Sequence, residues 1–155
     1  MPNNFIEEME FVFPRDYSPE DIKNLKFENE WAMEEIVPGK TVKWRIGFLE
    51  DTIKEEELRG ITIFTKGKMS QKPFLFELTG GISAQNALEY MTGQVQIDFI
   101  DEGEVDLIAT ERQRINLESE EGQLIKNWGQ ELIKKLTSIW KERRSEKRTA
   151  ELESK

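Results

Sequence analysis

The sequence predicts an α+β domain, in which a mixed β-sheet carries two helices on one face. Apolar and polar residues alternate over residues 41–49 and again over residues 61–65, as they do in half-buried strands. A further alternating run covers residues 94–100 and follows a short helical pattern. Apolar residues then recur at intervals of three and four from Ile125 to Ile139, which is typical of an amphipathic helix.

The composition is that of one polar folding domain with an acidic balance. The chain has 155 residues, of which 34% are charged and 37% hydrophobic, and its formal net charge is −9. This length allows one domain with a real core and is too short for two ordinary ones. Acidic residues outnumber basic ones over residues 1–60 and over residues 61–140, whereas residues 141–155 hold six basic and four acidic residues. We therefore expect no nucleic-acid partner.

Cysteine and histidine are both absent from the sequence. Thiolate chemistry, imidazole acid–base catalysis and the usual zinc or iron sites are therefore excluded. No apolar run approaches the length of a membrane span, and the first residues lack the pattern of a signal peptide. We expect a cytoplasmic protein with no membrane partner.

The first half of the chain is predicted to hold an irregular arm followed by strands. Residues 10–13 could form a short strand, and residues 1–40 as a whole are interpreted as an arm or linker that packs on the following domain. The strands over residues 41–49 and 61–65 come next. Residues 66–68 are typical of a tight turn into a short third strand.

A short helix and a long one are predicted in the second half. Ser83 can cap the short helix, and Gly93 stands where its C-cap would be. One face of that helix would hold Ala84, Ala87, Leu88 and Met91. Ser119 is in the position of an N-cap for the long helix. Residues 141–155 are expected to fray, with a charged tail over residues 146–155.

The stretch between residues 94 and 116 is the main candidate for a function. It begins as a strand, continues as an acidic loop and ends in Arg112-Gln113-Arg114, just ahead of the long helix. Guanidinium and amide groups at such a tip suit an anionic ligand. A solvated turn is the more common outcome for a stretch of this kind.

The acidic loop in this stretch is a second candidate, for a divalent cation. The carboxylates are those of Asp98, Asp101, Glu102, Glu104 and Asp106. Their spacing fits no EF-hand, since the turn glycine and the terminal Glu are missing, and a solvated loop is the more common outcome. The sequence shows no P-loop or dinucleotide fingerprint, and no nucleophile–base pair unless the fold brings a Ser and a Lys together. No activity is expected from this chain alone.

Four runs of the sequence together resemble one family: LRGITIFTKGKMSQKPFLFE, ALEYMTGQVQIDFID, DLIATERQRIN and WGQELIKKLTSIWKERR. They resemble the second, or transducer, domain of the gyrase–chaperone–kinase–MutL (GHKL) ATPases. The prokaryotic ATP-binding proteins similar to the ninety-kilodalton heat-shock chaperone are the nearest in pattern, and the second domains of gyrase B, MutL and MORC are also similar. The resemblance implies a transducer domain over residues 41–145, in the order strand-strand-strand-helix-strand-helix with a left-handed crossover. Residues 1–40 would then connect it to a preceding ATPase domain.

The resemblance also implies a role for the loop before the long helix. In the chaperone's middle domain an Arg of this loop reaches the γ-phosphate of ATP bound in the neighbouring domain, whereas gyrase uses a Gln and a Lys and MutL a Lys. Arg112 would be the phosphate-contacting residue and Gln113 its amide partner, with Arg114 as the alternative contact because this loop is slightly shorter. ATP and Mg would be bound only through an N-terminal GHKL ATPase domain, in cis or in trans.

A protein-interaction or dimerisation module with no nucleotide role is the alternative function. The helix that carries Trp128 and Trp140 would then dock a partner or a second copy of the chain. Phe74 and Phe76 would do so if they are exposed. A homodimer is therefore left open.

Overall fold

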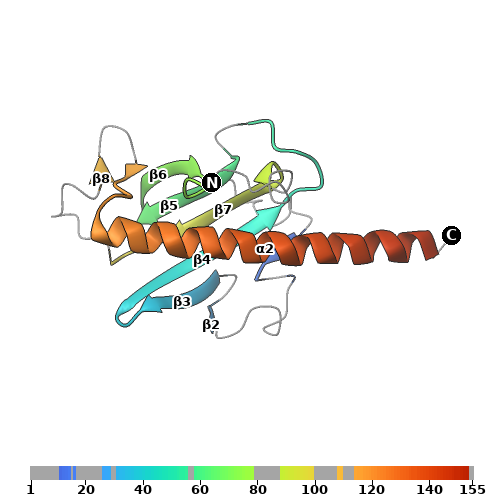
Figure 1. Cartoon of the computed structure of the whole chain (residues 1–155), viewed down its shortest axis with the longest axis horizontal. Coiled ribbons are helices and arrows are strands. Elements are labelled where there is room, and N and C mark those ends of the chain that lie inside the picture. Colours follow the sequence, from blue (N-terminus) through green and yellow to red (C-terminus); the bar gives the residue numbers. More distant parts are fainter. Residues whose placement is uncertain are drawn as a thin grey trace.

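The chain forms a mixed β-sheet with one long helix on its face (Figure 1). This computed structural model describes residues 11–14, 16, 26–28, 31–55, 58–78, 88–99, 108–109 and 114–153, and of residues 26–28, 108–109 and 114 only the backbone. Within these residues the helix is α2 (Glu120–Glu153), which lies at the C-terminal end of the chain. The predicted α+β class with a mixed sheet is confirmed.

The large sheet has the strand order β2-β3-β4-β7-β5-β6, and β1 pairs with β4 beside this path. Its strands are β1 (Phe11–Phe13), β2 (Lys26–Glu28), β3 (Trp31–Val37), β4 (Lys40–Phe48), β5 (Gly60–Thr65), β6 (Lys68–Phe74) and β7 (Met91–Gln96). Strands β8 (Ile108–Ala109) and β9 (Arg114–Ile115) form a separate antiparallel pair. In the large sheet β5 and β7 run parallel, and the other pairs are antiparallel. The strand of this sheet that comes last in sequence, β7, therefore lies near its centre, between β4 and β5.

Two separate segments pair with the same edge of β4. Strand β3 pairs with residues 40–44 of β4, and β1 pairs with residues 46–48. Strand β7 pairs with residues 43–48 on the opposite edge. The short strand predicted over residues 10–13 is confirmed as β1. Strand β3 was not predicted, and it extends the sheet across the domain boundary expected at residue 40.

The strands predicted at residues 41–49 and 61–65 are confirmed as β4 and β5, and the short third strand predicted after residues 66–68 is confirmed as β6. The tight turn between β5 and β6 is also confirmed. Its two central residues, Lys66 and Gly67, have φ of 51° and 84°. Positive φ at both central positions is typical of a type I′ hairpin, whose twist matches that of the flanking strands.

The predicted strand over residues 94–100 corresponds to β7 but begins earlier, at Met91. Met91 is therefore a buried strand residue, and its assignment to a helix face is wrong. Gly93 is not a helix C-cap either. A Cβ there would lie 2.7 Å from Ile46 Cγ1 and 2.9 Å from Ile61 Cδ1, so a close approach of neighbouring strands requires glycine. The rest of the predicted short helix, residues 83–87, lies outside the described residues.

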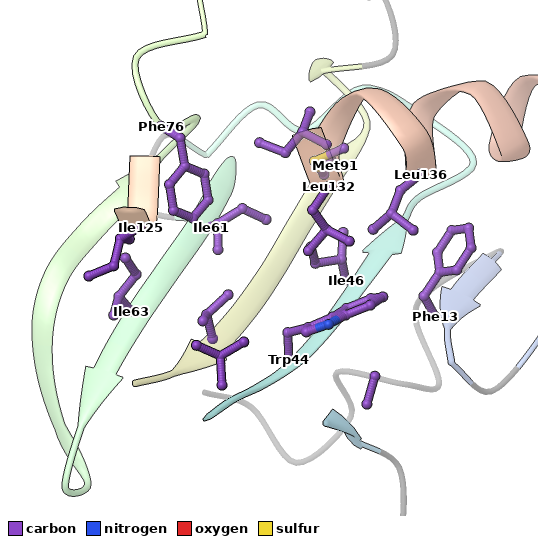
Figure 2. Close-up of a cluster of buried hydrophobic side chains, with 14 of the residues drawn as sticks. Phe13, Trp44, Ile46, Ile61, Ile63, Phe76, Met91, Ile125, Leu132 and Leu136 are labelled. Atoms are coloured by element: carbon purple, nitrogen blue, oxygen red, sulfur yellow. The ribbon is translucent and has the colours of Figure 1, made fainter. Parts of the chain in front are cut away.

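The core lies between the sheet and α2. Figure 2 shows Ile125, Leu132 and Leu136 of the helix in one layer with the side chains that rise from β4, β5 and β7. These strand residues include Trp44, Ile46, Ile61, Ile63 and Met91, all of them fully buried. The alternation in β4 and the spacing of three and four in α2 therefore place their apolar faces against each other, as predicted.

Helix α2 begins at the predicted cap and continues further than predicted. The Gly122 N–H donates to Ser119 Oγ at 2.9 Å, which confirms Ser119 as the N-cap. The helix continues to Glu153, so the fraying expected from residue 141 is wrong over residues 141–153. The last buried residue of the helix is Trp140. Beyond it, Arg144 and Lys147 still contact Tyr90 and Phe11 beside the sheet, and the end of the helix projects past the sheet (Figure 1).

Phe76 packs directly on the middle of α2. Its side chain is 1% exposed, and a Cβ at Gly129 would lie only 2.3 Å from the Phe76 ring. Phe76 and Glu77 both have positive φ, 54° and 59°, so the chain turns sharply after β6. Gln130 Nε2 donates to the Phe76 carbonyl at 2.8 Å and holds this turn against the helix. Strand β6 thus ends at Phe74, and the chain continues into a turn that buries Phe76.

Candidate functional site

The candidate site is the β8–β9 hairpin that precedes α2. Ile108 pairs with Ile115 and Ala109 with Arg114, so the two ends of the segment 110–113 are brought together. The predicted catalytic residues Arg112 and Gln113 belong to this segment and lie outside the described residues. Of Arg114, the third predicted contact, the structure describes the backbone in β9. The structure therefore describes the two strands that flank the predicted phosphate-contacting residues.

A buried glutamine ties this hairpin to the large sheet. The Ile115 N–H donates to Gln71 Oε1 at 2.9 Å, and Gln71 Nε2 donates to the Lys72 carbonyl at 3.0 Å. Gln71 is 8% exposed and Ile115 is 4% exposed. The Gln71 side chain of β6 therefore accepts a hydrogen bond from a buried N–H of β9. Without this acceptor, water could reach the N–H only if the hairpin moved away from the sheet. The sequence signal for this role is weak: Gln71 is one polar residue in a short strand.

The connection from β9 to α2 is fixed by a series of short local hydrogen bonds. The Glu118 N–H donates to Asn116 Oδ1 at 3.0 Å, and Ser119 Oγ donates to the Asn116 carbonyl at 2.8 Å. Ser119 Oγ in turn accepts from Gly122, as described above. A Cβ at Gly122 would lie 2.0 Å from the Asn116 carbonyl oxygen, so the turn closes tightly on the first helical turn. Short hydrogen bonds thus tie the turn after β9 to the first turn of α2.

The charged residues near these elements are engaged in structural contacts. Asp98 Oδ1 accepts from the Lys66 N–H at 2.8 Å and so holds the β5–β6 turn beside the end of β7. Lys40 and Glu121 form an ion pair of 2.8 Å between β4 and the first turn of α2. The other carboxylates of the predicted cation loop, Asp101, Glu102, Glu104 and Asp106, lie outside the described residues. Among the residues that are described, no group of acidic side chains is arranged to hold a metal ion.

The aromatic residues considered as a docking surface are largely inside the fold. Trp140 is 3% exposed, and its ring stacks on Phe48 with centroids 4.8 Å apart. Phe76 is buried beneath α2, and Trp128 Nε1 donates to Glu34 Oε2 at 2.9 Å. Over the described part of the chain, the exposed large apolar side chains are Met69 and Leu152, on β6 and near the end of α2. These two residues do not form a continuous apolar surface.

No family model, curated protein or solved structure matches this chain. In the part of the chain that the structure describes, no helix has both the length and the apolar character that crossing a membrane requires. The phosphate-contacting role of this site therefore stays a prediction from the sequence resemblance, and the structure adds the paired strands that flank it.

Proposed function

We propose that this chain is the transducer domain of a GHKL-type ATPase, similar to that of the ninety-kilodalton heat-shock chaperone. In this proposal Arg112 and Gln113 contact the γ-phosphate of ATP that a separate N-terminal domain binds together with Mg. Arg114 is the alternative contact. Hydrolysis would then be coupled to a movement between the two domains. The chain alone supplies half of a site, so it should not hydrolyse ATP.

One observation carries this proposal: the segment that contains Arg112 connects two paired strands directly before a long, capped helix. The hairpin is bonded to the sheet through Gln71 and to α2 through Asn116 and Ser119. In this proposal, a phosphate contact made by the segment 110–113 would act on the sheet through β9 and Gln71, and on α2 through Asn116 and Ser119. The mixed sheet with a C-terminal helix agrees with the coarse architecture that the resemblance implies, and the left-handed crossover is part of the proposal.

The proposed chemistry needs no residue type that the chain lacks. A guanidinium presents several N–H donors in a plane and keeps its charge at any physiological pH, so it suits the oxygens of a terminal phosphate. Such a contact stabilises the charge that develops on the phosphate during transfer. After hydrolysis the γ-phosphate is gone and the contact is lost. The hairpin then favours a different domain arrangement, which is a nucleotide-dependent two-state switch.

The test is ATP turnover by a protein that contains both domains. Arg112→Ala should lower the turnover by ~10²-fold or more, since comparable electrostatic contacts to a transition state have this magnitude. Arg114→Ala measures the alternative register in the same assay. Lys134→Ala is a matched control, because Lys134 is an exposed cation on α2 that lies outside the hairpin. If turnover with Arg112→Ala and with Arg114→Ala stayed within about threefold of the parent, the proposal would be wrong.

The interaction-module alternative makes a different prediction. It requires an exposed apolar surface, and Trp140 and Phe76 are buried in the described fold. Sedimentation of the chain over a wide concentration range distinguishes the two functions. A dimer that dissociates when Met69 is replaced by Lys would favour the interaction module over the transducer.

A further inference from the structure

A shallow cleft lies between α2 and the start of β7, far from the β8–β9 hairpin. Its volume is about 390 Å³. It is lined by Glu89, Tyr90, Trp140, Lys141, Arg144, Ser145 and Arg148. The helical residues recur at intervals of three and four, so they share one face of α2. Arg144 follows Ser119 by 25 residues, which corresponds to about 37 Å along the helix axis. The cleft is therefore separate from the candidate phosphate loop.

The guanidinium of Arg144 is held in the cleft by two aromatic rings. Arg144 Cζ lies 5.0 Å from the ring centroid of Tyr90 and 5.0 Å from that of Trp140. The two rings are themselves in contact, with centroids 5.4 Å apart, and Trp140 is fixed by its stack on Phe48. A guanidinium over aromatic rings can still direct its N–H groups at an acceptor. Because its position is already restricted, it loses little conformational freedom when a ligand binds.

The cations of the cleft are not neutralised by the rest of the described chain. No carboxylate of a described residue lies within ion-pair distance of Lys141, Arg144 or Arg148. The cleft contains one acidic side chain, Glu89, against these three cations. It is thus a local positive site in a chain whose net charge is −9. Such a site attracts an anion at short range.

We propose that this cleft binds a small organic phosphate that carries hydroxyl groups. Two or three cations with a serine hydroxyl suit a phosphate dianion, since Arg and Lys donate charge-assisted hydrogen bonds to its oxygens. The volume lies at the lower end of the range of small-molecule sites. The acidic surface of the whole chain repels long polyanions more strongly than a small dianion, which disfavours nucleic acid as the ligand.

Glu89 indicates the second part of the ligand. A carboxylate beside a phosphate site repels the phosphate itself, but it accepts a hydrogen bond from a nearby hydroxyl group. A ligand with a phosphate at one end and hydroxyl groups at the other satisfies both sides of the cleft. Inorganic phosphate satisfies only the cationic side, so it should bind more weakly than a hydroxylated phosphate ester.

The test is a titration of the 155-residue chain with glycerophosphate, at an ionic strength of about 0.15 M to screen diffuse charge effects. The reporter is the indole N–H signal of Trp140 in NMR spectra, because this ring lines the cleft. The signal should shift saturably. Arg144→Gln should weaken binding about tenfold or more, which is the usual range for a charge-assisted hydrogen bond. Arg148→Gln should also weaken it, and Arg148 is an exposed residue of α2, so this variant should fold even if Arg144→Gln does not.

Two further variants distinguish a specific binding site from nonspecific electrostatic attraction to α2. Lys134→Gln removes the same charge from an exposed position on α2 outside the cleft, and it should change the affinity less than about twofold. Glu89→Gln should tighten binding of inorganic phosphate and reduce the preference for glycerophosphate over it. The proposal is overturned if Lys134→Gln weakens binding as much as the two arginine variants do, or if the Trp140 signal does not shift. A short oligonucleotide is a further probe. If it bound more tightly than glycerophosphate, and if Arg144→Gln abolished that binding, the assignment to a small ligand would also be overturned.

Discussion

Replacement of Gly129 by Ala in α2 should destabilise the protein, although a Gly→Ala substitution usually stabilises a helix. In a helix interior, Ala is more stable than Gly by about 0.5–1 kcal/mol, because Gly loses more backbone freedom on folding. At Gly129, however, a Cβ would lie 2.3, 2.4 and 2.5 Å from three atoms of the Phe76 ring. Ordinary van der Waals contact begins near 3.4 Å. The ring would have to move by about 1 Å to restore normal contact.

The surroundings of Phe76 leave little room for that movement. Its ring lies between Phe74, at a centroid distance of 4.6 Å, and Trp128, at 6.1 Å. Its carbonyl accepts from Gln130, so the backbone is also held. Overpacking of this kind typically costs about 1–3 kcal/mol. After the helix-propensity gain of about 0.5–1 kcal/mol is subtracted, Gly129→Ala should lower the free energy of unfolding by up to about 2.5 kcal/mol.

Urea unfolding of the variant and the parent measures this difference. Ser138→Ala is the control, since Ser138 is exposed on the same helix, and the free energy of unfolding should stay within about 0.5 kcal/mol of the parent. Phe76→Leu makes room for the methyl group, so the effect of Gly129→Ala in that background should be neutral or stabilising. An increased free energy of unfolding for Gly129→Ala alone would refute the packing argument.

Three further predictions concern the elements that position the hairpin and the helix. Gln71→Leu leaves the buried Ile115 N–H without its acceptor, so it should lower the free energy of unfolding by about 1–3 kcal/mol and speed hydrogen exchange at Ile115. Unchanged exchange at Ile115 would contradict the tie to β6. Ser119→Ala removes the N-cap of α2 and should cost about 1 kcal/mol in the same urea assay, and a loss below a few tenths would mean that the cap is dispensable. Lys40→Ala breaks the partly exposed pair with Glu121 and should cost at most about 1 kcal/mol at low salt and less at 1 M salt, whereas a salt-independent loss would assign the effect to packing.

The elements that the sequence predicts well are those with a local signal. The alternation that buries Val42, Trp44 and Ile46 and the spacing that buries Ile125 and Leu136 follow from the periods of a strand and a helix. The cap of α2 and the turn between β5 and β6 depend on residues that are adjacent in sequence. In each of these elements the local preference agrees with the final packing, so the sequence is sufficient.

The errors arise where distant contacts decide the structure. Strand β3 carries Glu34 and Glu35 side by side and has a register shift between Glu35 and Val37, so its apolar residues do not alternate. It is a strand because β4 offers an unpaired edge. Met91 follows Leu88 at helical spacing, yet it belongs to β7, which is placed by parallel pairing with β5. Such pairing has no signature in the segment itself.

The candidate site also has a part that the sequence predicts and a part that it does not. The basic tip before the long helix is visible in the sequence, because Arg112, Gln113 and Arg114 stand together ahead of a capped helix. The hydrogen bond that ties β9 to the large sheet is not visible, since Gln71 and Ile115 are 44 residues apart. The cation–aromatic cleft is equally hidden: it combines Tyr90 with residues of α2 that were expected to fray.

The irregular pairing of β6 has a consequence for strand pairing between copies of this chain. β6 lies at the end of the strand order, where an exposed strand edge can recruit a strand from another molecule. Its register shifts between the partners of Ile61 and Ile63, where the opposing segment contains Lys72 and Pro73. Pro73 has no N–H to offer, and Lys72 is exposed and charged. The distortion that accompanies the Gln71 tie therefore also discourages edge-to-edge aggregation of the folded chain.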